Sequence, residues 1–255
     1  MGNIILDMSG AYDTDWCRGL CENDGFSYID CKDIEGTDMY CDDLAITEIM
    51  GRIRGNETEP ECKIYSGVHF IDSGNYHYMT RLFTGEIKAS YNLFFFDHHT
   101  DMKPSMIPEL LSCGAWALHV AERDSFIKKI IMIGPPAEDV TEDILTWESI
   151  IYSGGKYAGS DEFVSDILKG GIDFALPYYI SIDKDVLGRG YADTNWSQGD
   201  MELGELFSLM EAIKKLCGGA PLGIDICGEL PGKGSSVNES TNNKILDFLK
   251  STGLF

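Results

Sequence analysis

The chain has 255 residues, of which 42 are acidic and 20 basic, so its formal net charge is −22. Such a charge repels nucleic acid and anionic lipid, so we expect no nucleic-acid partner, and it favours cationic ligands. No apolar run approaches the ~20 residues of a membrane span. The first residues, MGNIILDMSG, show no basic leader with a cleavage pattern, so we expect a cytoplasmic protein without a membrane partner.

A single large α/β domain is the expected organisation. A length of 255 residues and a hydrophobic content of 44% suit one core, so the domain is expected to span residues 1–255. The eight cysteines are expected to be reduced thiols. Cys17 and Cys21 lie four apart without a neighbouring histidine or second pair, which does not favour a zinc site. Cys113 is the thiol that falls near the candidate site described below.

The first third of the chain predicts short buried strands and one amphipathic helix. Apolar runs predict strands at Ile4 to Met8, Phe26 to Cys31 and Lys63 to Asp72. Apolar residues at helical spacing predict a helix over Leu44 to Arg54, ended by Gly55.

The rest of the chain alternates strands with helices. Further strands are predicted at Asn92 to Phe96, Lys129 to Gly134, Phe174 to Asp183 and Pro221 to Gly228. Helices are predicted to begin at Met79 to Phe83 and to cover Glu109 to Arg123, Asp161 to Lys169, Glu202 to Leu216 and Lys244 to Lys250. A short helix capped by Thr141 is predicted within Thr141 to Ile151, and loops are predicted at Gly188 to Met201 and Gly232 to Asn243. This alternation predicts a three-layer α/β/α fold around a mostly parallel sheet, with ligands at the carboxyl ends of the strands.

Two acidic clusters directly follow apolar runs. The stretch Asn92 to Met102, NLFFFDHHTDM, carries Asp97, His99 and Asp101 on one side if the backbone stays extended. The stretch Tyr178 to Asp185, YYISIDKD, repeats the arrangement with Asp183 and Asp185. Carboxylates and an imidazole converging at the end of a buried strand are the donors that a divalent metal needs.

These motifs resemble those of the arginase and agmatinase (ureohydrolase) family. That family has a histidine after a glycine-rich strand exit, then DxHxD, then SxDxD, then a late glutamate followed by proline. The counterparts here are His77, Asp97 to Asp101, Ser181 to Asp185, and Glu229 with Pro231. The resemblance spans roughly residues 60–235 and implies an arginase-like α/β fold.

The resemblance also implies two metal ions. Asp97 and Asp183 would bridge them, with His77 and Asp101 completing one ion and His99 and Asp185 the other. Carboxylate and imidazole donors suit Mn²⁺, and also Zn²⁺, Fe²⁺ or Co²⁺. Two such ions hold a bridging hydroxide that attacks a guanidinium or amide carbon.

The implied catalytic residues are Asp101, which would orient the nucleophile, and Glu229, which would hold a cationic guanidinium over the metals. Asp225 and His98 are interpreted as packing residues or as neighbours of the ligands. The substrate is expected to be a small molecule, and cationic guanidino compounds are the first candidates.

The chain departs from the family at two points. DVLGRG replaces the Asp-Pro pair after SxDxD, and SCGAWALH replaces the segment that carries the arginases' proton-shuttle histidine. Trp116 stands where that histidine would be, and His119 is a loose substitute. The metal ligands are therefore better supported than arginine specificity.

Three functions stay open at this point. The first is a dinuclear metal-dependent hydrolase of a linear C–N bond in a small molecule. The second is a deacetylase-like amidohydrolase of the same fold, which uses a single zinc and lacks counterparts of Asp101 and Asp185. The third is a non-catalytic metal-binding protein with the arginase fold. The native metal and the oligomeric state, a homo-oligomer included, stay open as well.

Overall fold

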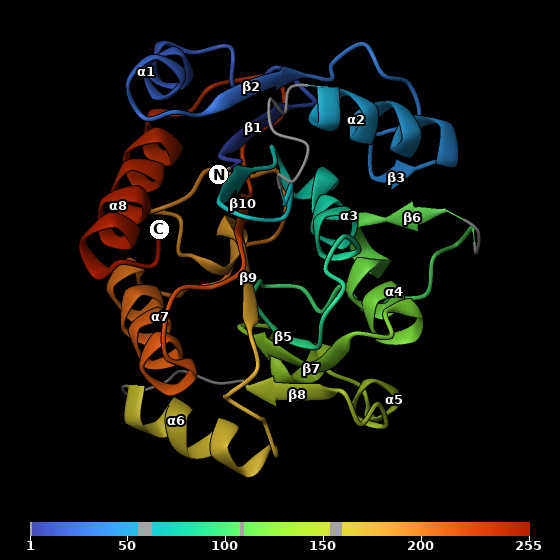
Figure 1. Cartoon of the computed structure of the whole chain (residues 1–255), viewed down its shortest axis with the longest axis vertical. Helices are drawn as coiled ribbons and strands as arrows, with labels where there is room; N and C mark the ends of the chain where they lie inside the picture. Colours follow the sequence, from blue (N-terminus) through green and yellow to red (C-terminus); the bar gives the residue numbers. More distant parts are fainter. Residues whose placement is uncertain (1, 56–62, 108–109, 154–159) are drawn as a thin grey trace.

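A computed structural model describes residues 2–55, 63–107, 110–153 and 160–255. Within them, eight strands form one sheet in the order β2-β1-β4-β10-β9-β5-β7-β8, and every neighbouring pair is parallel (Figure 1). These strands are β1 (Ile4–Asp7), β2 (Ser27–Asp30), β4 (Val68–Phe70), β5 (Tyr91–Phe96), β7 (Ile127–Ile133), β8 (Ile150–Ser153), β9 (Tyr178–Asp183) and β10 (Ile224–Cys227). The short strands β3 (Tyr40–Cys41) and β6 (Leu111–Ser112) pair antiparallel apart from this sheet.

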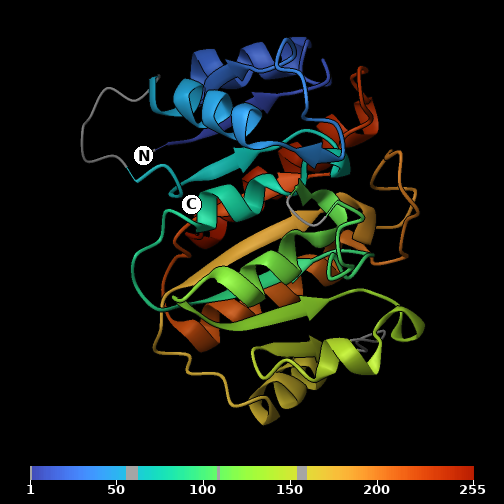
Figure 2. The ribbon, with the colours of Figure 1, turned by 90° about the vertical axis from the view of Figure 1, so that its right-hand side faces the viewer.

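Helices cover both faces of the sheet. One core cluster joins the sheet to α2 (Asp43–Gly55), α3 (Met79–Thr84), α4 (Trp116–Arg123) and α5 (Glu142–Leu145). The other joins it to α1 (Asp15–Asn23), α6 (Ser160–Lys169), α7 (Leu203–Cys217) and α8 (Ser236–Thr252). Figures 1 and 2 show these two sets on opposite sides of the sheet. The predicted three-layer α/β/α fold is confirmed.

The central strands are apolar because they are buried on both faces. All six residues of β5 and all six of β9 are buried, which explains why these strands read as continuous apolar runs. In the register, Phe96 lies beside Ile182 and Cys227 beside Asp183. The polar residues that follow β5, β9 and β10 therefore meet at one edge of the sheet.

Several predicted elements differ from the observed ones where polar residues are buried. The loop predicted at Gly232 to Asn243 is wrong, because α8 begins at Ser236, with the Ser235 hydroxyl accepting the N–H of Asn238. Thr241 and Asn242 in its first turns are buried although polar. The apolar pattern in the sequence therefore predicts a helix only from Lys244 onward. The helix α1 was not predicted at all.

Other boundaries were placed wrongly where short turns interrupt a pattern. The short helix predicted from Thr141 is α5, whereas the edge strand β8 that follows it was not predicted. The helix predicted to start at Glu109 starts at Trp116, after β6 and a 3-10 turn, η2 (Cys113–Ala115); residue 109 lies outside the described residues. The strand predicted from Lys63 is confined to β4, because Gly67 turns the chain with a φ of 108°. None of the helices that the structure describes is both long and apolar enough to cross a bilayer.

Candidate metal centre

The structure brings the six predicted ligands together at the carboxyl edge of the central strands. Asp97 follows β5, Asp183 ends β9, and His77 follows a 3-10 turn, η1 (Gly74–Tyr76), after β4. Five of the six are buried, and His99 is the partly exposed one. They are His77, Asp97, His99, Asp101, Asp183 and Asp185.

The D-x-H and D-x-D spacings form the same local turn. Asp97 Oδ1 accepts the backbone N–H of His99 at 2.6 Å, and Asp183 Oδ1 accepts that of Asp185 at 2.9 Å. An aspartate that accepts the N–H two residues on fixes a tight turn at a strand end. Asp101 has a φ of 48°, so it reaches the centre through a left-handed backbone rather than through the extended alternation expected from the sequence.

Two groups of donors result, which we call the His77 group (His77, Asp97, Asp101) and the His99 group (Asp97, His99, Asp185). In the first, His77 Nδ1 lies 3.1 Å from Asp97 Oδ2 and 3.1 Å from Asp101 Oδ2. In the second, His99 Nδ1 lies 2.9 Å from Asp185 Oδ2 and 3.4 Å from Asp97 Oδ1. Asp97 therefore offers one carboxylate oxygen to each group.

Asp183 is placed differently from Asp97. Its Oδ2 lies 3.7 Å from His77 Nδ1, whereas its Oδ1 accepts the Asp185 N–H that forms the turn. Asp183 thus faces the His77 group directly. Its bridging role, which the resemblance implies, stays a prediction.

The arrangement of His77 fits a metal ligand. Its Nε2 lies 2.9 Å from Ser181 Oγ, whereas its buried Nδ1 has no hydrogen-bond partner and faces three carboxylates. Gly74 lets the preceding turn come this close, because a Cβ there would lie 2.9 Å from Asp183 Oδ2 and 2.8 Å from the Trp196 ring. An imidazole nitrogen among carboxylate oxygens is a donor set for a divalent cation.

The electrostatics of the centre also favour a cation. Burial raises the pKa of Asp183 and of Asp185, and the charge of Asp97 raises both further. Burial lowers the pKa of His99, but its hydrogen bonds to Asp185 and Asp97 outweigh this and raise the pKa to about 11. The carboxylates therefore repel one another and draw positive charge. A divalent ion meets that demand by displacing the protons.

Trp116 contacts a predicted ligand, and His119 does not. The Trp116 indole is fully buried and its Nε1–H donates to Asp101 Oδ2, so it holds the carboxylate that faces His77. His119 lies instead in a separate groove between α2, α3 and α4, together with Arg81 and Arg123. Trp116, which stands where the resemblance would place a proton-shuttle histidine, is therefore a hydrogen-bond donor to Asp101.

Glu229 is buried and is not among the residues that line the cavity described below. Its carboxylate accepts hydrogen bonds from Lys184 Nζ and, at 2.8 Å, from Asn242 Nδ2. Lys184 lies between the two aspartates of SxDxD and is fully buried. No local sequence pattern indicates this ion pair, because Lys184 and Glu229 are 45 residues apart. The expected role of Glu229 in holding a cationic substrate stays a prediction.

The remaining sequence candidates lie around the centre. The His98 backbone N–H donates to Asp185 Oδ1 at 3.0 Å, and Asp225 forms a buried cluster with His69 and Tyr179. In the described part of the chain, neither His98, Asp225, Cys17 nor Cys21 belongs to a group of metal donors. Cys227 does, beside His77 and Asp183. Cys227 was not predicted as a ligand, although it ends a buried strand as Asp183 does.

A cavity of about 290 Å³ opens above the centre. Its floor is formed by carboxylates of both groups, and its rim carries one lysine, Lys103, among mainly small and apolar residues. The volume is at the low end of the range for small-molecule pockets. Its lining residues are Met39, Tyr40, Gly74, Asp97, His99, Thr100, Asp101, Lys103, Pro104, Ser105, Met106, Ser112, Cys113, Gly114, Asp183, Asp185 and Trp196.

Comparison with known proteins identifies the fold. No protein-family model matches the chain. An uncharacterised protein of Thermotoga maritima is 28% identical over 228 residues, which are 88% of this chain and 78% of that protein.

Among solved structures, Entamoeba histolytica arginase in complex with L-ornithine matches with a TM-score of 0.66 and 13% identity, covering 98% of this chain and 99% of that one. The chain has the arginase fold. Formimidoylglutamase from Bacillus subtilis matches equally well, with a TM-score of 0.66 and 15% identity over 99% of this chain and 87% of that one. The arginase-like resemblance noted in the sequence is thus confirmed at the level of the fold.

Proposed function

We propose that this arginase-fold chain is a metal-dependent hydrolase that cleaves a linear C–N bond in a small molecule, using two divalent ions, Mn²⁺ first. The observation that carries the proposal is the placement of Asp97. Its two oxygens face two different histidines, each with a further carboxylate, under a cavity of small-molecule size. One ion would lie in the His77 group and the other in the His99 group. When bound, such a pair supplies Lewis-acid polarisation and activates water at neutral pH.

The chain's own residues would position the reacting groups. Asp101 would accept a proton from the attacking water and release it to the leaving nitrogen, because its carboxylate lies on the cavity floor and is held in place by the Trp116 N–H. The apolar parts of Met39, Pro104 and Trp196 would exclude bulk water above the floor. Lys103 at the rim suits a substrate with an anionic end.

The substrate class follows less directly from these contacts. In the structure the carboxylate of Glu229 is paired with Lys184, so the use of Glu229 to hold a guanidinium would require this pair to open. Guanidino, formimidoyl and amide groups all offer a trigonal carbon bound to nitrogen. We place guanidino compounds first because of the motif resemblance and the acidic cavity floor.

The experiment is a hydrolysis assay on metal-free protein reloaded with Mn²⁺. Guanidino, formimidoyl and N-acetyl derivatives of one carbon skeleton would be compared by their release of urea, ammonia and acetate. We expect metal-dependent turnover of the guanidino or formimidoyl derivative. In the Asp101→Asn variant, which removes the proposed proton acceptor, turnover should be slower by at least about 100-fold.

Two results would replace the proposal. Turnover of the N-acetyl derivative alone, with a single bound ion, would support the deacetylase-like alternative. Tight binding of metal without turnover of any derivative would support a non-catalytic metal-binding protein.

A further inference from the structure

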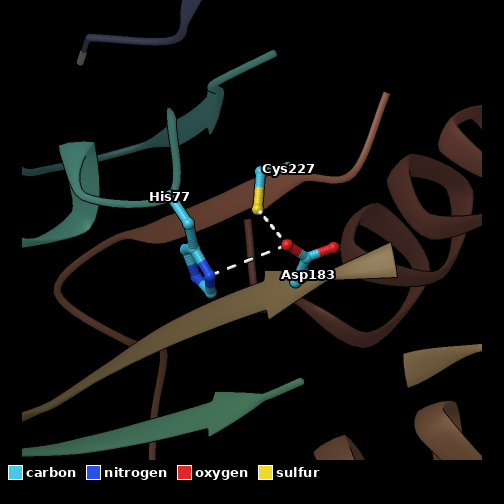
Figure 3. Close-up of side chains that lie close together, drawn as sticks. All are labelled: His77, Asp183 and Cys227. Carbon is cyan, nitrogen blue, oxygen red and sulfur yellow. Dashed lines mark hydrogen bonds and ion pairs between the residues drawn. The ribbon is translucent and has the colours of Figure 1, made fainter. Parts of the chain in front are cut away.

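Cys227 brings a thiol into the candidate metal centre. It is the last residue of β10 and is fully buried. In the sheet register it lies directly beside Asp183 on β9, and its Sγ lies 3.1 Å from Asp183 Oδ2. Figure 3 shows the thiol and the His77 ring approaching the same carboxylate from two sides.

The local backbone permits this approach. Gly228, which follows Cys227, has a φ of 90°, and a Cβ there would lie 2.6 Å from Asp183 Oδ1. Glycine therefore lets β10 end close against Asp183 without displacing its carboxylate. The thiol of Cys227 thereby reaches a donor group with His77 and Asp183.

A second observation points to a ligand at this position. His77 is 1% exposed and its Nδ1 has no hydrogen-bond partner, yet it lies 3.7 Å from the Asp183 oxygen that the thiol contacts. The donor atoms of His77, Asp183 and Cys227 all lie within 4.8 Å of one another. Thiolate, imidazole and carboxylate are the three ligand types that zinc uses in proteins.

We propose that Cys227, as a thiolate, is a metal ligand together with His77 and Asp183, so that the ion in the His77 group is preferentially Zn²⁺ or Co²⁺ rather than Mn²⁺. On binding, the S–H bond breaks, the proton passes to solvent and a sulfur–metal bond forms, with no change in the oxidation state of the ion. The inference rests on the proposed metal-dependent function and specifies which ion serves one half of the centre.

The two halves of the centre then differ in metal preference. A soft thiolate selects Zn²⁺ over hard ions, whereas carboxylate oxygens suit Mn²⁺. The His99 group contains carboxylates and one imidazole but no sulfur. A protein loaded with both metals should therefore carry Zn²⁺ on the His77 side and Mn²⁺ on the His99 side.

The test is X-ray absorption spectroscopy at the zinc edge on the full chain loaded with one equivalent of Zn²⁺. We expect a sulfur neighbour at about 2.3 Å in addition to nitrogen and oxygen neighbours at about 2.0–2.2 Å. Cys227→Ser should lose the sulfur neighbour and bind Zn²⁺ at least about tenfold more weakly. Even the loss of a group that only hydrogen-bonds to a metal ligand typically costs about 10–100-fold in metal affinity. Cys113→Ser is the matched control, since this thiol lines the cavity but belongs to none of the donor groups.

Cobalt titration gives an independent readout. The thiolate-to-Co²⁺ charge-transfer absorption should appear in the parent and in Cys113→Ser and be absent from Cys227→Ser. If the serine variant fails to fold, Cys227→Ala replaces it, and the parent spectrum still shows whether sulfur is bound.

A zinc spectrum without sulfur in the parent, or a sulfur signal that survives in Cys227→Ser, would overturn the inference. These outcomes are separable from failure of the proposed function. Sulfur coordination without any C–N hydrolysis leaves the inference standing and removes the hydrolase. Hydrolysis without sulfur coordination does the reverse.

Discussion

The His77 group and the His99 group contain similar donors in unlike surroundings. The His77 side chain is 1% exposed, whereas that of His99 is 26% exposed. The Nε2 of His77 is held by Ser181 in the core, but the Nε2 of His99 lies 2.8 Å from the exposed Ser197 on the loop after β9. The comparison indicates that an ion in the His77 group would be held by buried donors, whereas an ion in the His99 group would lie where ligands and water can exchange.

The largest effect is expected from Asp97→Asn, because Asp97 belongs to both groups. The two carboxylate oxygens of Asp97 face the two histidines, His77 and His99. The Asp97→Asn variant should therefore bind both ions more weakly. Loss of an indirect partner of a ligand typically costs about 10–100-fold in metal affinity, and we expect at least that at each position. Metal content after dialysis measures it. Retention of two tightly bound ions would show that Asp97 does not join the groups.

Asp183→Asn and Asp185→Asn test whether Asp183, like Asp97, binds both ions. If Asp183 bridges the two ions as the resemblance implies, Asp183→Asn should lower the affinity for both. Asp185→Asn should lower the affinity only for the ion of the His99 group. Calorimetric metal titration of the two variants gives the direct comparison. The assignment is wrong if Asp183→Asn keeps two tight ions while Asp185→Asn loses both.

Ser181→Ala should lower affinity on the buried side only. Ser181 is fully buried and lies 2.9 Å from His77 Nε2, so its loss frees the ring to rotate. We expect the ion of the His77 group to bind about 10–100-fold more weakly, while the ion of the His99 group is unchanged. Equal weakening of both ions in the same titration would contradict the independence of the halves.

Ser197→Ala makes the same chemical change on the exposed side and should have the smallest effect. Water replaces an exposed hydroxyl at little cost, so we expect the affinity of the His99 group to change by less than about threefold. If this variant weakens metal binding as much as Ser181→Ala does, the contrast between a buried and an open half must be abandoned.

Five of the six candidate ligands could be predicted because they stand at or just after the ends of two apolar runs, whereas His77 was predicted from the motif resemblance. An apolar run that ends in an aspartate marks a strand end, and parallel strands gather such ends at one edge. The buried strands β5 and β9 were predicted on the same basis. Asp97, His99 and Asp101, and then Asp183 and Asp185, are therefore visible from local sequence alone.

The residues that were missed depend on neighbours distant in the chain. Cys227 meets Asp183 only because β10 pairs with β9, and Lys184 meets Glu229 across 45 residues. No local pattern specifies that order of strands. The start of α8 was missed for a related reason, because Asn238, Thr241 and Asn242 are buried polar residues whose partners come from elsewhere in the chain.

Anomalous diffraction from crystals of the metal-loaded chain tests the central claim most directly. A dinuclear centre predicts two peaks, one among His77 Nδ1, Asp97 Oδ2 and Asp101 Oδ2, the other among Asp97 Oδ1, His99 Nδ1 and Asp185 Oδ2. Data collected at the zinc and manganese edges would identify the ion in each. Two peaks that share Asp97 would confirm the account. A single peak in fully loaded crystals, or Asp101 or Asp185 turned away from an occupied position, would contradict it.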